Sequence, residues 1–129
     1  MNYTVALAED NQVNRNIFLQ KINILGNLQV AFVAVNGHDC MEQLKGLPPA
    51  KIPQVIFMDL EMPEMDGAEA LREIRKLDDK VPVMAFTAAV YDNMQNDLKE
   101  KGFTDYIHKP FRPDDLHHKI ATYALPNRA

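Results

Sequence analysis

The feature that most constrains the fold is a repeated alternation between short apolar runs and segments whose apolar residues recur at helical spacing. The short runs, which are rich in strand-forming residues, span residues 3–8, 28–35, 55–59, 83–86 and 105–108. The residues at helical spacing are Val13, Ile17, Phe18, Ile22 and Leu25; Cys40, Met41 and Leu44; Ala70, Leu71, Ile74 and Leu77; Val90, Met94 and Leu98; and Leu116, Ile120 and Tyr123. Because the strands are apolar throughout instead of strictly alternating, they predict an α/β fold with a five-stranded parallel sheet flanked by five helices.

Turn-forming residues mark where the predicted elements begin and end. The expected boundaries are Asn11 and Gly26 for the first helix, Asn36 and Gly37 for a turn, Gly102 for the end of the fourth helix and Pro113 for the start of the fifth. Three prolines between residues 48 and 53 exclude regular structure before the third strand. The pattern contains no boundary at which the chain could divide, so we expect one domain over residues 1–129.

Charge and cysteine content limit the classes of partner and compartment. The net charge is −4, from 14 basic and 18 acidic side chains, and this argues against direct binding to nucleic acid or to an anionic membrane. A single cysteine, Cys40, excludes an internal disulfide and favours the reducing cytoplasm. The sequence has no apolar segment of membrane-spanning length, and its N-terminus has no leader pattern.

Polar residues follow the predicted strands at their carboxyl ends. They are Glu9, Asp10, Asp59, Thr87 and Lys109. Right-handed crossovers place the carboxyl ends of parallel strands on one edge of the sheet. In doubly wound sheets ligands bind at that edge, where the strand order reverses. The flavodoxin-like order 2-1-3-4-5 would place Asp10 beside Asp59, although the periodicity does not establish this order.

Asp59 is the residue of greatest chemical interest at this edge. It ends the apolar run VIFMD, where a carboxylate reaches solvent from a buried strand and could act as a nucleophile; taken alone, it could equally cap a turn. Three carboxylates at one edge would repel one another and raise their own proton affinities unless a cation lay among them. Mg²⁺ suits such a site, because it takes oxygen ligands and keeps several waters. We therefore expect Asp10 and Asp59 to be direct ligands, with Glu9 acting through water.

Four motifs in order make the chain resemble a response-regulator receiver domain of two-component signalling. They are the acidic pair Glu9 and Asp10, Asp59 within MDLEMPEMDG, Thr87 followed by Ala88, and Lys109 followed by Pro110 and Phe111. The opening AEDNQVNR is similar to that of receivers attached to hybrid sensor kinases, whereas the start at Met1 favours a free-standing protein. The resemblance implies a Mg²⁺-dependent phospho-acceptor in a phosphorelay, in which Asp59 takes a phosphoryl group from a phosphohistidine of a sensor histidine kinase or histidine phosphotransfer protein.

The resemblance also implies roles for residues around Asp59. The backbone carbonyl of Glu61 would be a further metal ligand, and the Lys109–Pro110 bond would be cis. Lys109 would stabilise the transferred group as a point charge. The hydroxyl of Thr87 and the amide of Ala88 would bind the phosphoryl group.

The resemblance further implies that phosphorylation acts as a switch. Tyr106 would move into space that Thr87 leaves, changing the face formed by the fourth helix, fifth strand and fifth helix. The output partner that reads this face stays unidentified. Such a domain catalyses only its own phosphorylation and dephosphorylation, so it is not an enzyme in the ordinary sense.

Two other functions use the same residues differently. A haloacid-dehalogenase-like phosphohydrolase also has an aspartate nucleophile and Mg²⁺ at a strand end, but its usual second aspartate is replaced here by Glu61. A receiver-like binding module would work by shape, without phosphorylation. The complete set of site residues argues against this module but does not show that the site is used.

Overall fold

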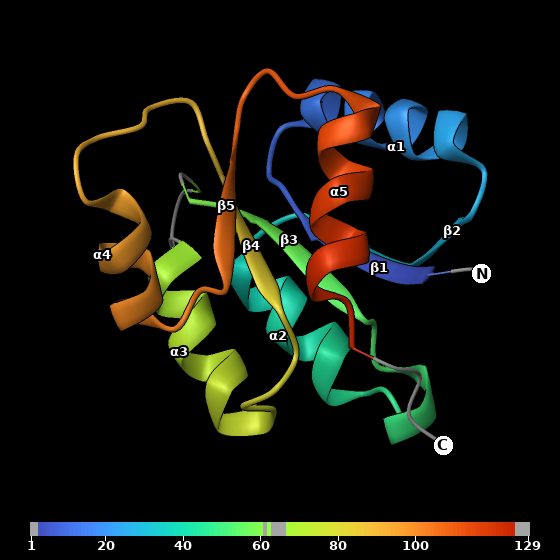
Figure 1. Ribbon diagram of the computed structural model, residues 1–129. Coiled ribbons are helices and arrows are strands. Elements are labelled where there is room, and N and C mark those ends of the chain that lie inside the picture. Colours follow the sequence, from blue (N-terminus) through green and yellow to red (C-terminus); the bar gives the residue numbers. More distant parts are fainter. Residues whose placement is uncertain (1–2, 61, 63–66, 126–129) are drawn as a thin grey trace.

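The structure is a computed structural model that describes residues 3–60, 62 and 67–125. Its strands are β1 (Tyr3–Ala8), β2 (Leu28–Ala34), β3 (Val55–Asp59), β4 (Val83–Thr87) and β5 (Asp105–His108). They form one parallel sheet in the order β2-β1-β3-β4-β5 (Figure 1). The predicted order is therefore confirmed. The chain passes from β1 to β2 on one side and then crosses to β3 on the other side of β1. The switch point, where the strand order reverses, therefore lies between β1 and β3.

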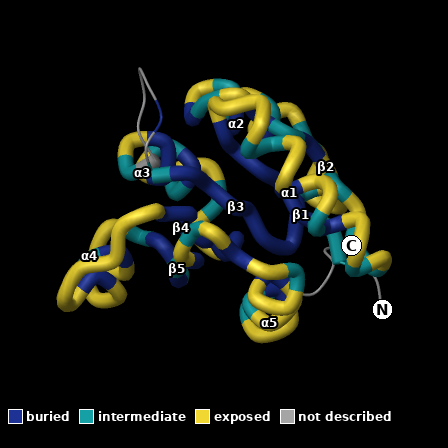
Figure 2. Tube along the Cα trace, turned by 90° about the horizontal axis from the view of Figure 1, so that it is seen from above, coloured by how far each residue is buried: buried dark blue, intermediate teal, exposed yellow. Residues whose placement is uncertain are grey.

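Helices cover both faces of the sheet, as its apolar strands require. They are α1 (Gln12–Leu25), α2 (Gly37–Lys45), α3 (Gly67–Leu77), α4 (Met94–Lys101) and α5 (Pro113–Tyr123), with a short 3-10 turn η1 (Pro49–Lys51) before β3. Helices α1 and α5 lie on one face, and α2, α3 and α4 lie on the other (Figure 1). Figure 2 shows that the strands are buried and that the outer surfaces of the helices are exposed. No helix in the described residues has the length and apolar content to cross a membrane.

Local capping chemistry explains how α1 begins and ends. The Asn11 side chain accepts a hydrogen bond of 3.0 Å from the Asn14 amide, which satisfies a free donor of the first turn. Gly26 ends the helix with φ of 76°, a left-handed conformation that glycine adopts without steric cost. Both boundaries confirm the sequence prediction.

Several predicted boundaries are wrong because side chains form hydrogen bonds with backbone groups at the ends of the elements. β2 ends at Ala34, since the Val35 amide turns to the Asp39 carboxylate at 3.0 Å. Asn36 is not a turn residue but the cap of α2, accepting from the Asp39 amide at 2.7 Å. The proline segment does contain regular structure, the turn η1, because a proline fits the first position of such a turn.

The predicted fourth helix is too long at its N-terminal end. Val90 lies outside α4 and is 47% exposed, whereas Met94 and Leu98 are buried as expected. The helix cannot extend back to Val90 because Asn93 has φ of 64°, outside the right-handed helical region. At the other end of the loop, β4 continues one residue further than predicted, to Thr87.

The core has one layer on each side of the sheet, and the layer under α1 and α5 is aromatic. Four phenylalanines, Phe18, Phe57, Phe86 and Phe111, lie with neighbouring ring centroids 4.9–6.3 Å apart. Such pairs contribute beyond their buried area. They join α1, β3, β4 and the segment after β5 directly beneath the edge that carries the polar residues.

A buried carboxylate joins β5 to α5. Asp105 is 3% exposed and accepts hydrogen bonds from the Lys119 ammonium at 2.6 Å and the Tyr123 hydroxyl at 2.9 Å. Burial raises the pKa of Asp105, but these donors and the Tyr106 amide outweigh it, so that its pKa lies below the ordinary value of 3.8. The carboxylate therefore holds the last helix on the sheet mainly in its ionised form.

Replacing Asp105 by Asn should lower the free energy of unfolding at neutral pH by about 2 kcal/mol, because it leaves Lys119 without its charged partner. The depressed pKa means that this stabilisation is present above the unfolded-state pKa. It is lost as the pH falls through the lower folded-state value. Urea unfolding from about pH 7 into the acid range should show the difference between the proteins shrinking. A difference independent of pH would show that the carboxylate charge is not involved.

Candidate functional site

Three carboxylates meet where β1 and β3 end. The register pairs Ala8 with Met58. Glu9, directly after β1, therefore lies beside Asp59, the last residue of the neighbouring strand β3. Glu9, Asp10 and Asp59 each offer an oxygen, and these atoms lie within 4.8 Å of one another. Glu9 and Asp59 are buried and Asp10 is exposed. The structure thus brings the predicted acids together at the switch point.

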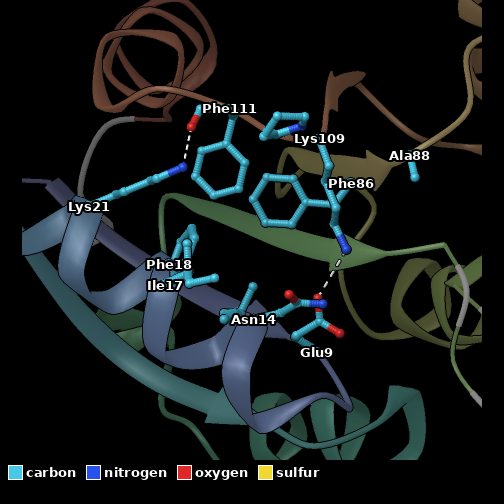
Figure 3. Close-up of a pocket in the computed structure, with 11 residues that line it drawn as sticks. Glu9, Asn14, Ile17, Phe18, Lys21, Phe86, Ala88, Lys109 and Phe111 are labelled. Atoms are coloured by element: carbon cyan, nitrogen blue, oxygen red, sulfur yellow. Dashed lines mark hydrogen bonds and ion pairs between the residues drawn. The ribbon is translucent and has the colours of Figure 1, made fainter.

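The side chain of Lys109 reaches the acids from the end of β5. Its ammonium lies 3.1 Å from a Glu9 oxygen and 3.3 Å from an Asp59 oxygen, and Figure 3 shows the contact with Glu9. Burial lowers the pKa of Lys109, but the hydrogen bond to Glu9 and the charges of both acids outweigh this and raise it. Lys109 is therefore a permanent cation at neutral pH. Its bond to Pro110 is cis, as the resemblance implies.

Glu9 has the most perturbed carboxyl group of the site. Burial raises its pKa most, and the hydrogen bond and charge of Asp59 raise it further, while Lys109 opposes them. The result is a pKa of about 7, against an ordinary value of 4.5. Burial, together with the neighbouring Asp59 carboxylate, thus favours proton uptake by Glu9. The all-oxygen donor set, partly open to solvent at Asp10, fits a hard divalent cation such as Mg²⁺.

The side chain of Thr87 is engaged with its own loop. Its hydroxyl donates to the Ala89 carbonyl at 2.8 Å and accepts from the Ala89 amide at 3.1 Å. Ala88 is exposed beside it, and Tyr106 is partly buried against the core under α4. Glu61, the remaining predicted site residue, lies outside the described residues.

A pocket of about 370 Å³ adjoins the acids between α1 and the segment after β5. Figure 3 shows Ile17 and Phe18 on one side and Phe86 and Phe111 on the other, with Glu9 and Lys109 at one end. Val13 and Ile17 are 64% and 39% exposed, whereas Phe18 and Ile22 of the same helically spaced set are buried. The part of α1 nearest the acids therefore presents apolar side chains to solvent.

Sequence reasoning missed two side chains that shape the site. Arg15 donates from its guanidinium to the Glu9 carbonyl at 2.9 Å and fixes the start of α1 against the end of β1. The Nε2 atom of His108 lies 3.1 Å from the Ala88 carbonyl. Arg15 stands within the AEDNQVNR opening, which could have drawn attention to it, whereas nothing in the sequence relates His108 to Ala88.

The fold and the site define a doubly wound α/β domain with acids and a lysine at its switch point. The family model described as the response regulator receiver domain matches residues 5–121. The chain therefore belongs to the response regulator receiver domain family.

The similar proteins differ in how much of their length this chain covers. Chemotaxis protein CheY of Thermotoga maritima is 32% identical over 107 residues, which cover 83% of this chain and 86% of CheY. The peroxide stress-activated histidine kinase mak1 of Schizosaccharomyces pombe is 36% identical over 114 residues, covering 84% of this chain and 7% of the kinase. The chain also spans only 28% of a protein-glutamate methylesterase/protein-glutamine glutaminase of Treponema denticola.

Solved structures share the whole fold. The receiver domain of the sensor histidine kinase PA1611 from Pseudomonas aeruginosa matches with a TM-score of 0.80 and 26% identity, over 95% of this chain and 98% of that one. That structure has a magnesium ion coordinated in its active site cleft. The response regulator domain of Thermotoga maritima CheB matches with a TM-score of 0.81 at 24% identity, over 95% of this chain and 96% of that one, and shows the fold alone.

Proposed function

We propose that this domain accepts a phosphoryl group on Asp59 from a phosphohistidine of a partner protein. The observation that carries the proposal is the geometry around Asp59, which lies 3.3 Å from the Lys109 ammonium and within a cluster of three acids at the switch point. This arrangement offers a nucleophile with positive charge beside it. Membership of the receiver family and the relation to histidine kinases support the same chemistry.

In the proposed reaction an Asp59 carboxylate oxygen attacks phosphorus and forms an acyl phosphate. The phosphorus–nitrogen bond to the donor histidine breaks, and its electron pair stays on the imidazole nitrogen, which takes up a proton. Lys109 would move from the acids toward the phosphoryl oxygens, and the Thr87 hydroxyl and Ala88 amide would donate to them. Mg²⁺ held by Asp10 and Asp59, with Glu9 beside them, would supply charge neutralisation at these oxygens. Glu61 stays a proposed backbone ligand.

A stoichiometric acceptor can be distinguished from the two alternative functions. Incubation with Mg²⁺ and a small acyl or amido phosphate should add one phosphoryl group to the chain, detected by intact-protein mass spectrometry. A phosphohydrolase would instead release phosphate from esters in steady turnover. A module that works by shape alone would gain no phosphoryl group, and that result would refute the proposal.

Proton uptake by Glu9 predicts how cation binding depends on pH. Because a proton on Glu9 competes with the cation, Mg²⁺ affinity should rise about tenfold between about pH 6 and about pH 8, through the pKa of about 7. Calorimetric titrations at several pH values would measure the change. Replacing Glu9 by Gln should flatten this dependence, and an equally steep dependence in that variant would show that another group titrates.

We infer that the donor docks on α1 beside the pocket. Val13 and Ile17 expose apolar area next to Glu9 and Lys109, where a protein delivering a phosphohistidine to Asp59 must lie. The donor would be a sensor histidine kinase or a histidine phosphotransfer protein, meeting this domain in the cytoplasm. The face formed by α4, β5 and α5 would then change through Thr87 and Tyr106 and meet the output partner.

Replacing Ile17 by Glu should slow phosphotransfer from a histidine-phosphorylated donor at least about tenfold, because it places a charge in an apolar contact. Uptake from a small phosphodonor should stay within about twofold of wild type. Rapid-quench kinetics with both donors would separate the two effects. Equal loss with both donors would mean that the substitution disturbs the site and not the docking surface. Ile24, 72% exposed at the far end of α1, provides the matched control, Ile24→Glu.

A further inference from the structure

The loop between β4 and α4 is held by a side chain that has no part in the proposed chemistry. The Cα register pairs His108 on β5 with Thr87 on β4, so both residues stand at the same level of the sheet edge. From there the His108 ring reaches the first residue of the loop, with Nε2 at 3.1 Å from the Ala88 carbonyl oxygen. A carbonyl can only accept, so Nε2 carries the hydrogen in this contact.

This contact fixes one end of a single peptide group. The Ala88 carbonyl and the Ala89 amide belong to the same peptide plane. The carbonyl is bound by His108, and the amide donates to the Thr87 hydroxyl at 3.1 Å. The Thr87 hydroxyl in turn donates to the Ala89 carbonyl at 2.8 Å. The Thr87 hydroxyl and residue Ala89 are therefore joined by two hydrogen bonds. His108, on the neighbouring strand, binds the other end of the Ala88–Ala89 peptide.

Moving the Thr87 hydroxyl toward a phosphoryl group would break both of its bonds to Ala89. The loop could follow the hydroxyl only by also releasing the Ala88 carbonyl from His108, while its other end is held by the Tyr91 hydroxyl, which donates to the Asp97 carboxylate on α4. The contact between His108 and Ala88 is therefore a hydrogen bond that favours the resting conformation in addition to the two between Thr87 and Ala89. We propose that His108 is a positioning residue that latches the β4–α4 loop in its resting conformation and thereby opposes phosphorylation of this domain.

The inference rests on the proposed function, since it assigns Thr87 a phosphoryl partner. It adds a residue, His108, that shifts the equilibrium between the resting and the phosphorylated conformations of the loop. Loss of one net hydrogen bond should change the equilibrium between the two loop conformations about fivefold. Because His108 is exposed, its replacement should leave the fold intact.

The latch can be tested first in the unphosphorylated protein. His108→Phe removes the donor and keeps a planar ring, whereas His108→Gln keeps an N–H donor on a side chain of similar reach. Hydrogen exchange of the Ala89 amide should become about fivefold faster in His108→Phe and stay at the wild-type rate in His108→Gln. The same change at an exposed helical histidine, His117→Phe, should have no effect on this amide.

The consequence for the switch is measured with beryllofluoride, a mimic of the phosphoryl group, in the presence of Mg²⁺. His108→Phe should bind it about fivefold more tightly than wild type, and His108→Gln should bind like wild type. Unchanged or weaker binding by His108→Phe would overturn the latch, as would identical behaviour of the two variants. If the wild-type protein binds no beryllofluoride and gains no phosphoryl group, the proposed function fails, while the exchange of the Ala89 amide still decides whether His108 holds the loop.

Discussion

Replacing Asp59 by Asn should reduce phosphoryl uptake at least about a thousandfold, because the amide has nearly the shape of the carboxylate but no nucleophilic oxyanion. The cluster of acids should tolerate the change, since one of three mutually repelling charges is removed. The pKa of Glu9 should fall toward its ordinary value of 4.5, because the Asp59 hydrogen bond and charge both raise it. Mass spectrometry of the phosphorylated protein and NMR titration of Glu9 measure the two effects.

A matched substitution tests whether the loss of phosphoryl uptake is specific to Asp59. Asp79→Asn makes the same chemical change at an exposed position in the turn before β4, and it should take up phosphoryl groups at the wild-type rate. Thermal unfolding of both variants should show that the fold is intact. If Asp59→Asn still accepted a phosphoryl group, peptide mapping would identify another acceptor, with the exposed Asp10 the first to examine, and the assignment of Asp59 would be wrong.

Replacing Phe18 by Ala should lower the free energy of unfolding by about 4 kcal/mol. Phe18 is 1% exposed, and its ring centroid lies 5.4 Å from that of Phe57 and 5.7 Å from that of Phe86. Truncation would leave a cavity between α1 and the sheet, where three other rings cannot close in without moving their own strands. Urea unfolding followed by circular dichroism measures the loss as a lower midpoint at unchanged slope.

The control for Phe18 lies on the same helix. Ile24 is 72% exposed, so Ile24→Ala should change the free energy of unfolding by less than about 0.5 kcal/mol. A loss below about 1.5 kcal/mol for Phe18→Ala would show that the aromatic layer relaxes around the gap. A full loss would show that the rings beneath Glu9 and Lys109 stay in place around the gap.

The sheet and its polar edge could be read from the sequence because they depend on local patterns. An apolar run such as residues 55–59 signals a buried strand wherever it pairs, and a polar residue directly after it must lie at the carboxyl end. Parallel strands with right-handed crossovers then bring those ends to one edge without knowledge of any contact. Glu9, Asp59 and Lys109 could thus be assigned to the same edge.

The ends of the helices and the exposure of their side chains could not be predicted as well, because they depend on which neighbouring residues pack together. Helical spacing grouped Val13 with Phe18, and Val90 with Met94. In the structure the inner face of α1 is set by where Phe18 meets the other rings, and α4 is shortened by the backbone of Asn93. A spacing of four identifies one face of a helix. Which face meets the sheet, and where the helix begins, is decided by packing.

By itself the sequence determined the alternation of strands and helices and the chemical character of the sheet edge, because both follow from the period of apolar residues and from chain direction. Only the tertiary structure decided which atoms meet there: Lys109 against Glu9 across 100 residues of sequence, and His108 against Ala88 across 20. The physical reason is that a hydrogen bond requires its donor and acceptor atoms to lie about 3 Å apart, and residue spacing does not encode distances between strand ends. Strand register and packing fix them only once the sheet has formed.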